Sequence, residues 1–140
     1  MTLSTTKSDL RVADLMTIDP IVVAFDATIE EAEELLRRNR ITGLPVVDAD
    51  RRLVGVISQT DLLYLAVPTV QALIRHHDRG VRVGEVMSTP PATIDGGATL
   101  RRAACIMVEQ RFHRLVAVDH GGRPIGVISA MDFVALYAED

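Results

Sequence analysis

The sequence has a single cysteine, Cys105, and no tryptophan among its 140 residues. One cysteine cannot form a disulfide bond within the chain, and because Cys105 stands in an apolar helical pattern, we expect a buried, unreactive thiol. The sequence also has no apolar run near the ~20 residues that a membrane-spanning helix needs. Its first residues carry no apolar stretch of the kind found in a secretory signal. These absences favour a cytoplasmic protein without a membrane partner.

Excess positive charge is also missing. Acidic residues outnumber lysine and arginine by 19 to 15, which gives a formal net charge of −4. A nucleic-acid backbone or an anionic membrane surface is bound by a basic face. The overall charge therefore argues against nucleic acid as a partner, although a basic pocket within an acidic chain is compatible with it.

Motifs that carry known catalytic chemistry are absent as well. The sequence contains no H-x-x-E-H, C-x-x-C, G-x-S-x-G or P-loop phrase. His76 and His77 are adjacent, so they point to different faces of a helix and do not form a metal pair; we expect a solvated helix there. A small enzyme built on His113 and an aspartate is the weaker alternative. We therefore predict a protein that is not an enzyme and requires no metal or cofactor.

What the sequence does contain is an internal repeat. The phrase Gly-Val-Ile-Ser at 55–58, followed by Asp61, returns at 126–129, followed by Asp132. The same shift of 71 residues extends without a gap back to the start of each copy, and sixteen residue pairs along it are identical. Composition alone does not keep one register for so long. The chain is therefore predicted to hold two copies of one unit.

The repeat also sets the expected boundaries. We predict repeat 1 at 10–66, a connecting segment with a further helix at 67–82, and repeat 2 at 83–140. With 48% hydrophobic residues, the chain can bury a core and is expected to fold as one compact module.

Each copy predicts the same order of elements. They are a helical turn (12–16 and 83–87), an extended segment (21–25 and 92–94), a helix that begins after a threonine (Thr28 and Thr99), a hairpin of two β-branched strands (44–48 with 53–58, and 115–119 with 124–129), and a closing helix (60–67 and 131–138). Pro20 and Pro91 are expected to end the first turn, because proline lacks the N–H donor. Glu31 completes a capping box in the first copy, whereas Arg102 replaces it in the second.

These elements predict an α/β (α+β) fold. Neither copy has enough apolar residues to cover both faces of a small sheet alone. We therefore expect two pseudo-symmetric repeats, each a small sheet with flanking helices, packed sheet to sheet. Such packing would create an internal pseudo-twofold axis and two equivalent clefts between the copies.

The repeated phrases resemble a tandem pair of cystathionine-β-synthase-type (CBS) domains, the arrangement called a Bateman module. The residues that carry the resemblance are V-x-[DE]-[LV]-M-[TS] at 12–17 and 83–88, Gly-Leu-Pro-Val-Val-Asp at 43–48, and Gly-Val-Ile-Ser-x-x-Asp at 55–61 and 126–132. Each phrase alone is weak, but together, twice and in one register, they are specific. The resemblance covers 10–140.

The resemblance implies a regulatory module that binds an adenosine-containing ligand, such as AMP, ADP, ATP or S-adenosylmethionine, and signals through a change in the shape of a homodimer that an unknown protein partner reads. It implies that Asp61 and Asp132 accept hydrogen bonds from the ribose hydroxyls and that Ser58 and Ser129 lie near ribose or phosphate. The residues implied around the base are Pro20, Val22, Thr42, Gly43 and Pro45 in the first copy and Pro91, Thr93, His113, Arg114 and Val116 in the second.

The chemistry of the two aspartates fits this role and one other. A carboxylate offers two acceptor oxygens to two neighbouring hydroxyls, and hydrogen bonds to charged groups contribute roughly 1.5–3 kcal/mol each. However, Ser-x-x-Asp before an apolar helix is also a helix cap. Spacing alone leaves both interpretations open.

The two copies differ beside these aspartates. Gly43 permits close approach of a flat base and Pro45 fixes the bend, although the same residues also suit a plain entry into a strand. The second copy has Arg114 and Val116 instead, and a guanidinium there could hold phosphate. Arg40 and Arg111 are further phosphate candidates, or simply pair with the helix dipole. A ligand-free dimerisation or interaction module is the alternative function.

Overall fold

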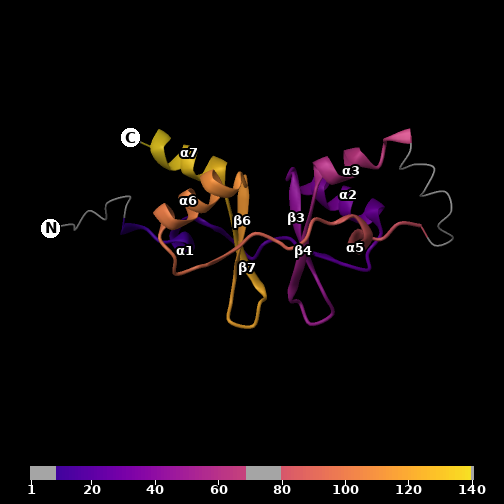
Figure 1. Ribbon diagram of the computed structural model, residues 1–140, viewed down its shortest axis with the longest axis horizontal. Coiled ribbons are helices and arrows are strands. Elements are labelled where there is room, and N and C mark those ends of the chain that lie inside the picture. Colours follow the sequence, from indigo (N-terminus) through magenta and orange to yellow (C-terminus); the bar gives the residue numbers. More distant parts are fainter. Residues whose placement is uncertain (1–8, 69–79, 140) are drawn as a thin grey trace. The chain divides into compact units, whose positions relative to one another are not determined.

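The computed structural model describes residues 9–68 and 80–139 (Figure 1). The first half contains α1 (Val12–Leu15), β1 (Thr17–Ile18), β2 (Val23–Ala24), α2 (Ile29–Asn39), β3 (Gly43–Val47), β4 (Leu53–Ser58) and α3 (Gln59–Tyr64). The second half contains α5 (Val83–Val86), β5 (Thr93–Asp95), α6 (Leu100–Gln110), β6 (Arg114–Val118), β7 (Pro124–Ser129) and α7 (Ala130–Ala138). The predicted order of elements is confirmed in both halves, with the short strand β1 as an addition.

The strands form two small mixed sheets. One has the order β2-β3-β4 and the other the order β1-β7-β6-β5. In each, the first strand of the repeat runs parallel to the hairpin strand beside it, and the hairpin is antiparallel. The hairpin registers agree with the repeat, since Leu44 pairs with Ile57 and Leu115 with Ile128. The α/β fold with two CBS-like repeats is therefore confirmed.

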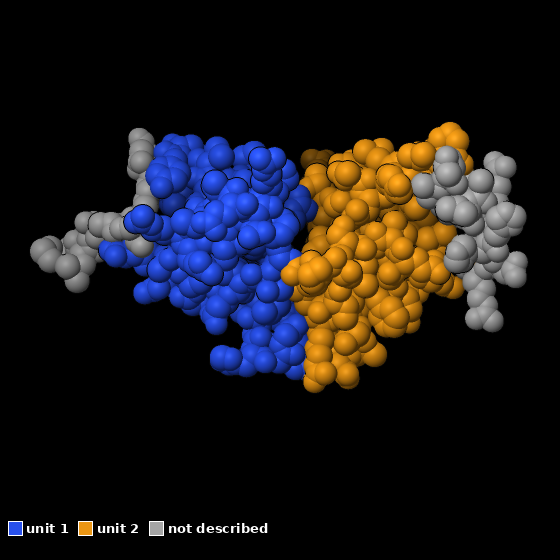
Figure 2. Space-filling model, in the orientation of Figure 1, with its two compact units in different colours: residues 1–20, 92–140 blue, residues 21–91 orange. Residues whose placement is uncertain are grey.

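The chain folds into two compact units whose boundaries differ from those of the repeats. Unit 1 comprises residues 1–20 and 92–140, and unit 2 comprises residues 21–91 (Figure 2). The first helical turn of each repeat thus packs with the strands of the other repeat. In unit 1 the N–H of Val12 donates to the carbonyl of Ala98 at 2.8 Å, and in unit 2 the N–H of Val83 donates to that of Ala27 at 2.9 Å.

The two sheet edges are completed in the same exchanged way. Thr17 of β1 pairs with Val127 of β7, and an isolated bridge joins Ser88 to Val56 in β4. Thr17 and Ser88 are equivalent in the repeat, as are Val127 and Val56. Each first turn therefore brings along a short segment that adds to the edge of the sheet it joins.

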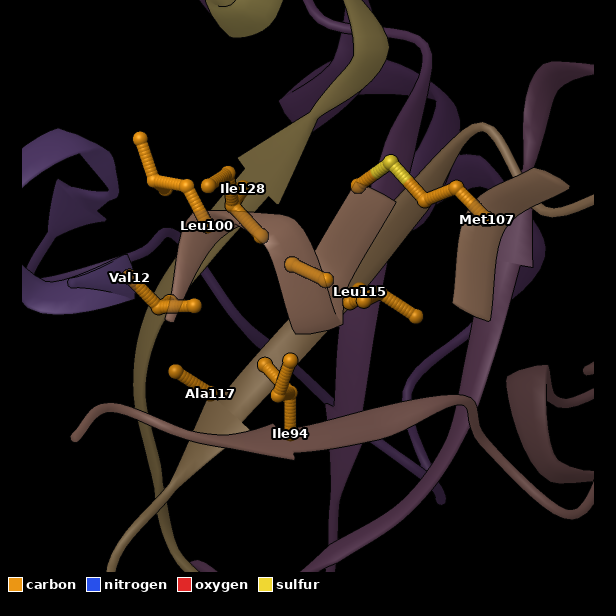
Figure 3. Close-up of a cluster of buried hydrophobic side chains, with 8 residues drawn as sticks. Val12, Ile94, Leu100, Met107, Leu115, Ala117 and Ile128 are labelled. Carbon is orange, nitrogen blue, oxygen red and sulfur yellow. The ribbon is translucent and has the colours of Figure 1, made fainter. Parts of the chain in front are cut away.

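Each unit has its own core on the helix side of its sheet. In unit 1, fully buried Val12 lies among side chains of β5, α6, β6 and β7, including Leu115 and Ile128 (Figure 3). In unit 2, fully buried Val83 occupies the same place among side chains that include Leu44 and Ile57. Alternation along the strands explains this, because every second residue points to one face.

Both long helices begin as the sequence predicts. Thr28 Oγ1 accepts from the N–H of Glu31 at 3.1 Å, and Thr99 Oγ1 accepts from the N–H of Arg102 at 3.0 Å. Loss of the glutamate in the second copy therefore leaves the threonine half of the cap in place. Both helices end on a left-handed arginine, Arg40 (φ 54°) and Arg111 (φ 60°).

Three expectations need correction or fall outside the described residues. Cys105 is exposed, because it faces away from the buried stripe of α6, so the prediction of a buried thiol was wrong. The first turns end at Leu15 and Val86, well before the prolines, because the chain becomes extended to join a sheet edge. The helix expected in 67–82, with its two histidines, lies largely outside the described residues.

The exchange of first turns yields a prediction about local stability. Val12→Ala should remove about 2 kcal/mol of buried apolar contact, and it should do so from unit 1 although Val12 belongs to repeat 1. Native-state hydrogen exchange should then show lost protection in β5–β7. Val83→Ala is the matched variant and should reduce protection in β2–β4. Loss of protection in β2–β4 on Val12→Ala would contradict the exchange.

A second prediction concerns Gly126 in β7. A Cβ at this position would lie 2.7 Å from Met16 Cγ and closer still to its Sδ, so only glycine leaves room for the Met16 side chain. Gly126→Ala should lower the free energy of unfolding by about 1–3 kcal/mol, measured by urea denaturation. Adding Met16→Ala should make the alanine at 126 cost much less than it does beside Met16. Equal costs in both backgrounds would show that the two residues do not interact.

Candidate functional site

The hairpin of unit 2 brings four of the predicted residues together. Gly43 at the start of β3 is the register partner of Ser58 at the end of β4. The N–H of Gln59, the first residue of α3, donates to the carbonyl of Thr42 at 2.8 Å. Asp61 follows one turn into the same helix. The strand end, the loop before β3 and the helix start are thus fixed side by side by backbone pairing.

The carboxylate of Asp61 caps α3. Its Oδ2 accepts from the N–H of Ser58 at 2.8 Å and from the Ser58 hydroxyl at 3.0 Å. The Ser58 Oγ in turn accepts from the N–H of Asp61 at 3.2 Å. The helix-capping interpretation is therefore correct for this residue. It engages only one carboxylate oxygen, however, and the cap holds the half-buried side chain in one orientation.

The second oxygen of Asp61 has a partner that sequence reasoning missed. The hydroxyl of Ser88 lies 3.3 Å from Asp61 Oδ1, a long contact for a hydroxyl donor. Ser88 belongs to the segment that follows α5 and bridges to the edge of β4. The sequence marks this position as a repeated Ser/Thr after Met, but it could not show which sheet edge the segment joins.

Unit 1 repeats the arrangement with different chemistry. Arg114 is the register partner of Ser129, and the N–H of Ala130 donates to the carbonyl of His113 at 2.8 Å. Asp132 Oδ2 accepts from the N–H of Ser129 at 2.7 Å and from its hydroxyl at 3.1 Å. Within the described ranges, Oδ1 of Asp132 accepts no hydrogen bond. Thr17, the equivalent of Ser88, does not take that role.

The residues predicted around the base are split between the units. Thr93 pairs with Val116 in unit 1, where the N–H of Val116 donates to the carbonyl of Ala92 at 2.9 Å. In unit 2, Val22 directly precedes β2 and stands next to buried Pro45, since Val23 pairs with Val46.

Pro20 and Pro91 do not stay with the sets predicted for them. Pro20 is the last residue of the first segment of unit 1, and Pro91 is the last residue of unit 2. Each therefore belongs to the unit opposite that of its predicted partners.

The arginines near these positions differ in exposure. Arg114 is half-buried, and burial lowers the pKa of its guanidinium, because an apolar environment disfavours the charged form. Arg40 and Arg111 are exposed at the ends of α2 and α6. Arg40 lines a groove of about 550 Å³ between α2 and α3, together with Leu36, Thr42 and Leu62.

Other kinds of site find little support. In the part of the chain that the structure describes, no three histidine, cysteine, aspartate or glutamate side chains gather in a way that could hold a metal ion. No helix among the same residues combines the length and apolar character needed to cross a membrane.

The chain is similar in sequence to known proteins over most of its length. The CBS domain-containing protein CBSX1 of Arabidopsis thaliana, described as chloroplastic, is 35% identical over 130 residues, which cover 77% of this chain and 55% of CBSX1. The inosine-5′-monophosphate dehydrogenase of Mycobacterium tuberculosis is 33% identical over 120 residues, 85% of this chain but only 21% of the enzyme. The chain thus spans about half of CBSX1 and about a fifth of the dehydrogenase, whose match is confined to its CBS region.

Solved structures share the fold. The crystal structure of CBSX2 in complex with AMP is 34% identical, with a TM-score of 0.80 over 92% of this chain and 96% of that chain. The CBS domain pair of protein MJ0100, in complex with 5′-methylthioadenosine and S-adenosyl-L-methionine, superposes with a TM-score of 0.81 over 93% of this chain and 97% of that chain; at 22% identity it supports the fold alone.

The CBS-domain family model matches residues 12–67 and 83–139, the two repeats identified from the shift of 71 residues. With both matches, the exchanged first turns and the two capped Ser-x-x-Asp helices, the chain belongs to the CBS-domain family as a tandem pair of CBS domains.

Proposed function

We propose that the chain is a regulatory module that binds an adenosine-containing ligand, with AMP as the first candidate. The observation that carries the proposal is the geometry of the Ser-x-x-Asp phrase. Each aspartate uses Oδ2 for the cap, and Oδ1 carries no cap bond. The related protein CBSX2, at 34% identity, binds AMP in its crystal structure.

Capping and ligand recognition support each other in this arrangement. The backbone N–H and the hydroxyl of the serine hold the carboxylate before any ligand arrives. A ribose diol that donates to the remaining lone pairs therefore meets an acceptor whose rotamer is already fixed, which lowers the entropy lost on binding. Each charged hydrogen bond contributes roughly 1.5–3 kcal/mol.

Regulation requires that the ligand favour one state of the protein. A ligand with equal affinity for two conformations shifts neither. We propose that the states are alternative shapes of a homodimer, read by a protein partner. No catalytic step is part of the proposal: in the described chain, no hydrogen bond or ion pair joins the His113 ring to an aspartate, so the alternative of a small enzyme gains no support.

The alternative of a protein-interaction module has an observation in its favour. Helix α7 is apolar on several faces, yet none of its residues is fully buried, and Met131, Val134 and Tyr137 are 70%, 58% and 63% exposed. Beside them, Leu100, Met107 and Phe133 line a groove of about 450 Å³ between α6 and α7. Exposed apolar surface of this kind marks protein contacts, and here it supports the homodimer without excluding a ligand.

Ligand binding is tested by thermal melting with AMP. At 100 times the dissociation constant, AMP should stabilise the protein by about 2.7 kcal/mol. Replacing both aspartates, in Asp61→Asn/Asp132→Asn, should abolish this shift. Asp14→Asn is the matched control, because Asp14 accepts from the N–H of Arg11 in the same capping position of α1 without a predicted ligand role. If the aspartates only cap, both variants melt earlier and keep the full AMP shift.

Self-association is tested on α7. Val134→Glu places a charge in the exposed apolar surface and should reduce the fraction of dimer in sedimentation velocity at micromolar concentration. Val134→Leu keeps the surface apolar and should leave the dimer intact. A wild-type chain that sediments as a monomer would refute the homodimer and leave the melting test unaffected.

A further inference from the structure

The two Ser-x-x-Asp positions carry different charges beside them. Across the hairpin, Ser129 faces Arg114, whereas Ser58 faces Gly43. Residues directly opposite in an antiparallel pair extend to the same face of the sheet, with Cβ atoms about 5 Å apart. The guanidinium of Arg114 therefore leaves the sheet on the side of Ser129 and its hydrogen-bonded partner Asp132.

The helix-side core is on the opposite face. Leu115 and Ala117, the neighbours of Arg114 and Val116 in β6, belong to the core cluster of unit 1. Arg114 thus extends away from α6 and α7, while remaining half-buried. A cation with reduced hydration gains more from an anion than an exposed one does, because the surrounding dielectric constant is lower.

Unit 2 has no counterpart to this cation on the corresponding face. Its arginine near the hairpin, Arg40, lines the groove with Leu36 and Leu62, two residues of the helix-side core region. Arg40 therefore opens onto the helix side, and Gly43 contributes no side chain beside Ser58.

The aspartates differ in the same direction. Oδ1 of Asp61 already accepts from the Ser88 hydroxyl at 3.3 Å, so a ribose would compete with that contact. Oδ1 of Asp132 has no such competitor among the described residues. Both the free acceptor and the cation thus belong to the second repeat.

We infer that the position built from Arg114, Ser129 and Asp132 takes a phosphate-bearing adenosine ligand, and that the position built from Gly43, Ser58 and Asp61 does not. This inference rests on the proposed function and makes it more specific. Among the adenosyl candidates it favours AMP, ADP and ATP over S-adenosylmethionine, whose sulfonium carries positive charge where these ligands carry phosphate. Adenosine should bind more weakly than AMP, because it lacks the group that Arg114 would hold.

Isothermal titration calorimetry of the full chain with AMP and with adenosine tests the inference. One AMP should bind per chain, at least tenfold more tightly than adenosine. Arg114→Gln should remove this preference by weakening AMP at least tenfold while leaving adenosine unchanged, and Arg114→Lys should retain part of it. Arg40→Gln is the matched control and should alter neither affinity. Asp132→Asn should abolish AMP binding, whereas Asp61→Asn should not.

The outcomes separate the inference from the proposed function. Equal affinity for AMP and adenosine, two equivalent AMP sites, or loss of AMP on Asp61→Asn or Arg40→Gln but not on Asp132→Asn would overturn the inference while leaving a nucleoside-binding module. Absence of heat and of a melting shift with both AMP and adenosine in the wild-type chain would overturn the proposed function and the inference with it.

Discussion

The fold depends on the burial of two equivalent valines in each other's half of the repeat. Val12 and Val83 are both fully buried, and each sits in a core built mainly by the other repeat. The turn that carries each valine also delivers a backbone segment to a sheet edge, which satisfies peptide groups that would otherwise face solvent unpaired. Two small sheets with modest cores thereby gain apolar contact and edge protection from one short element.

The same hairpins explain how a structural device can also be a binding device. A strand that ends in serine and continues directly into a helix needs a cap, and the aspartate one turn later supplies it. The cap uses one carboxylate oxygen and orients the other, so stability and recognition draw on different atoms of the same side chain. The duplication placed this device twice, and later differences at 43 and 114 gave the two copies different charge.

Much of the fold could be predicted from the repeat. A register of 71 residues located every hairpin and both capped long helices, because strand alternation and the threonine caps are local signals. The exchange of first turns could not be predicted, since a turn such as 12–15 carries no information about which copy it packs against. Cys105 was misplaced because the apolar pattern of α6 is broad enough to suggest two buried faces. The pairing of Ser58, Asp61 and Gly43 was accessible from sequence, whereas the Ser88 contact with Asp61 required the exchanged segment.

The division into units also has a consequence for the order in which the chain can acquire structure during synthesis. Unit 2 is continuous, residues 21–91, so all its strands and its buried valine emerge from the ribosome together. Unit 1 is discontinuous, and its opening segment must wait for β5, β6 and β7 before it has a core to enter. Closing so long a loop costs entropy that is recovered only when the final hairpin forms. The earliest residues made are thus among the last to be secured.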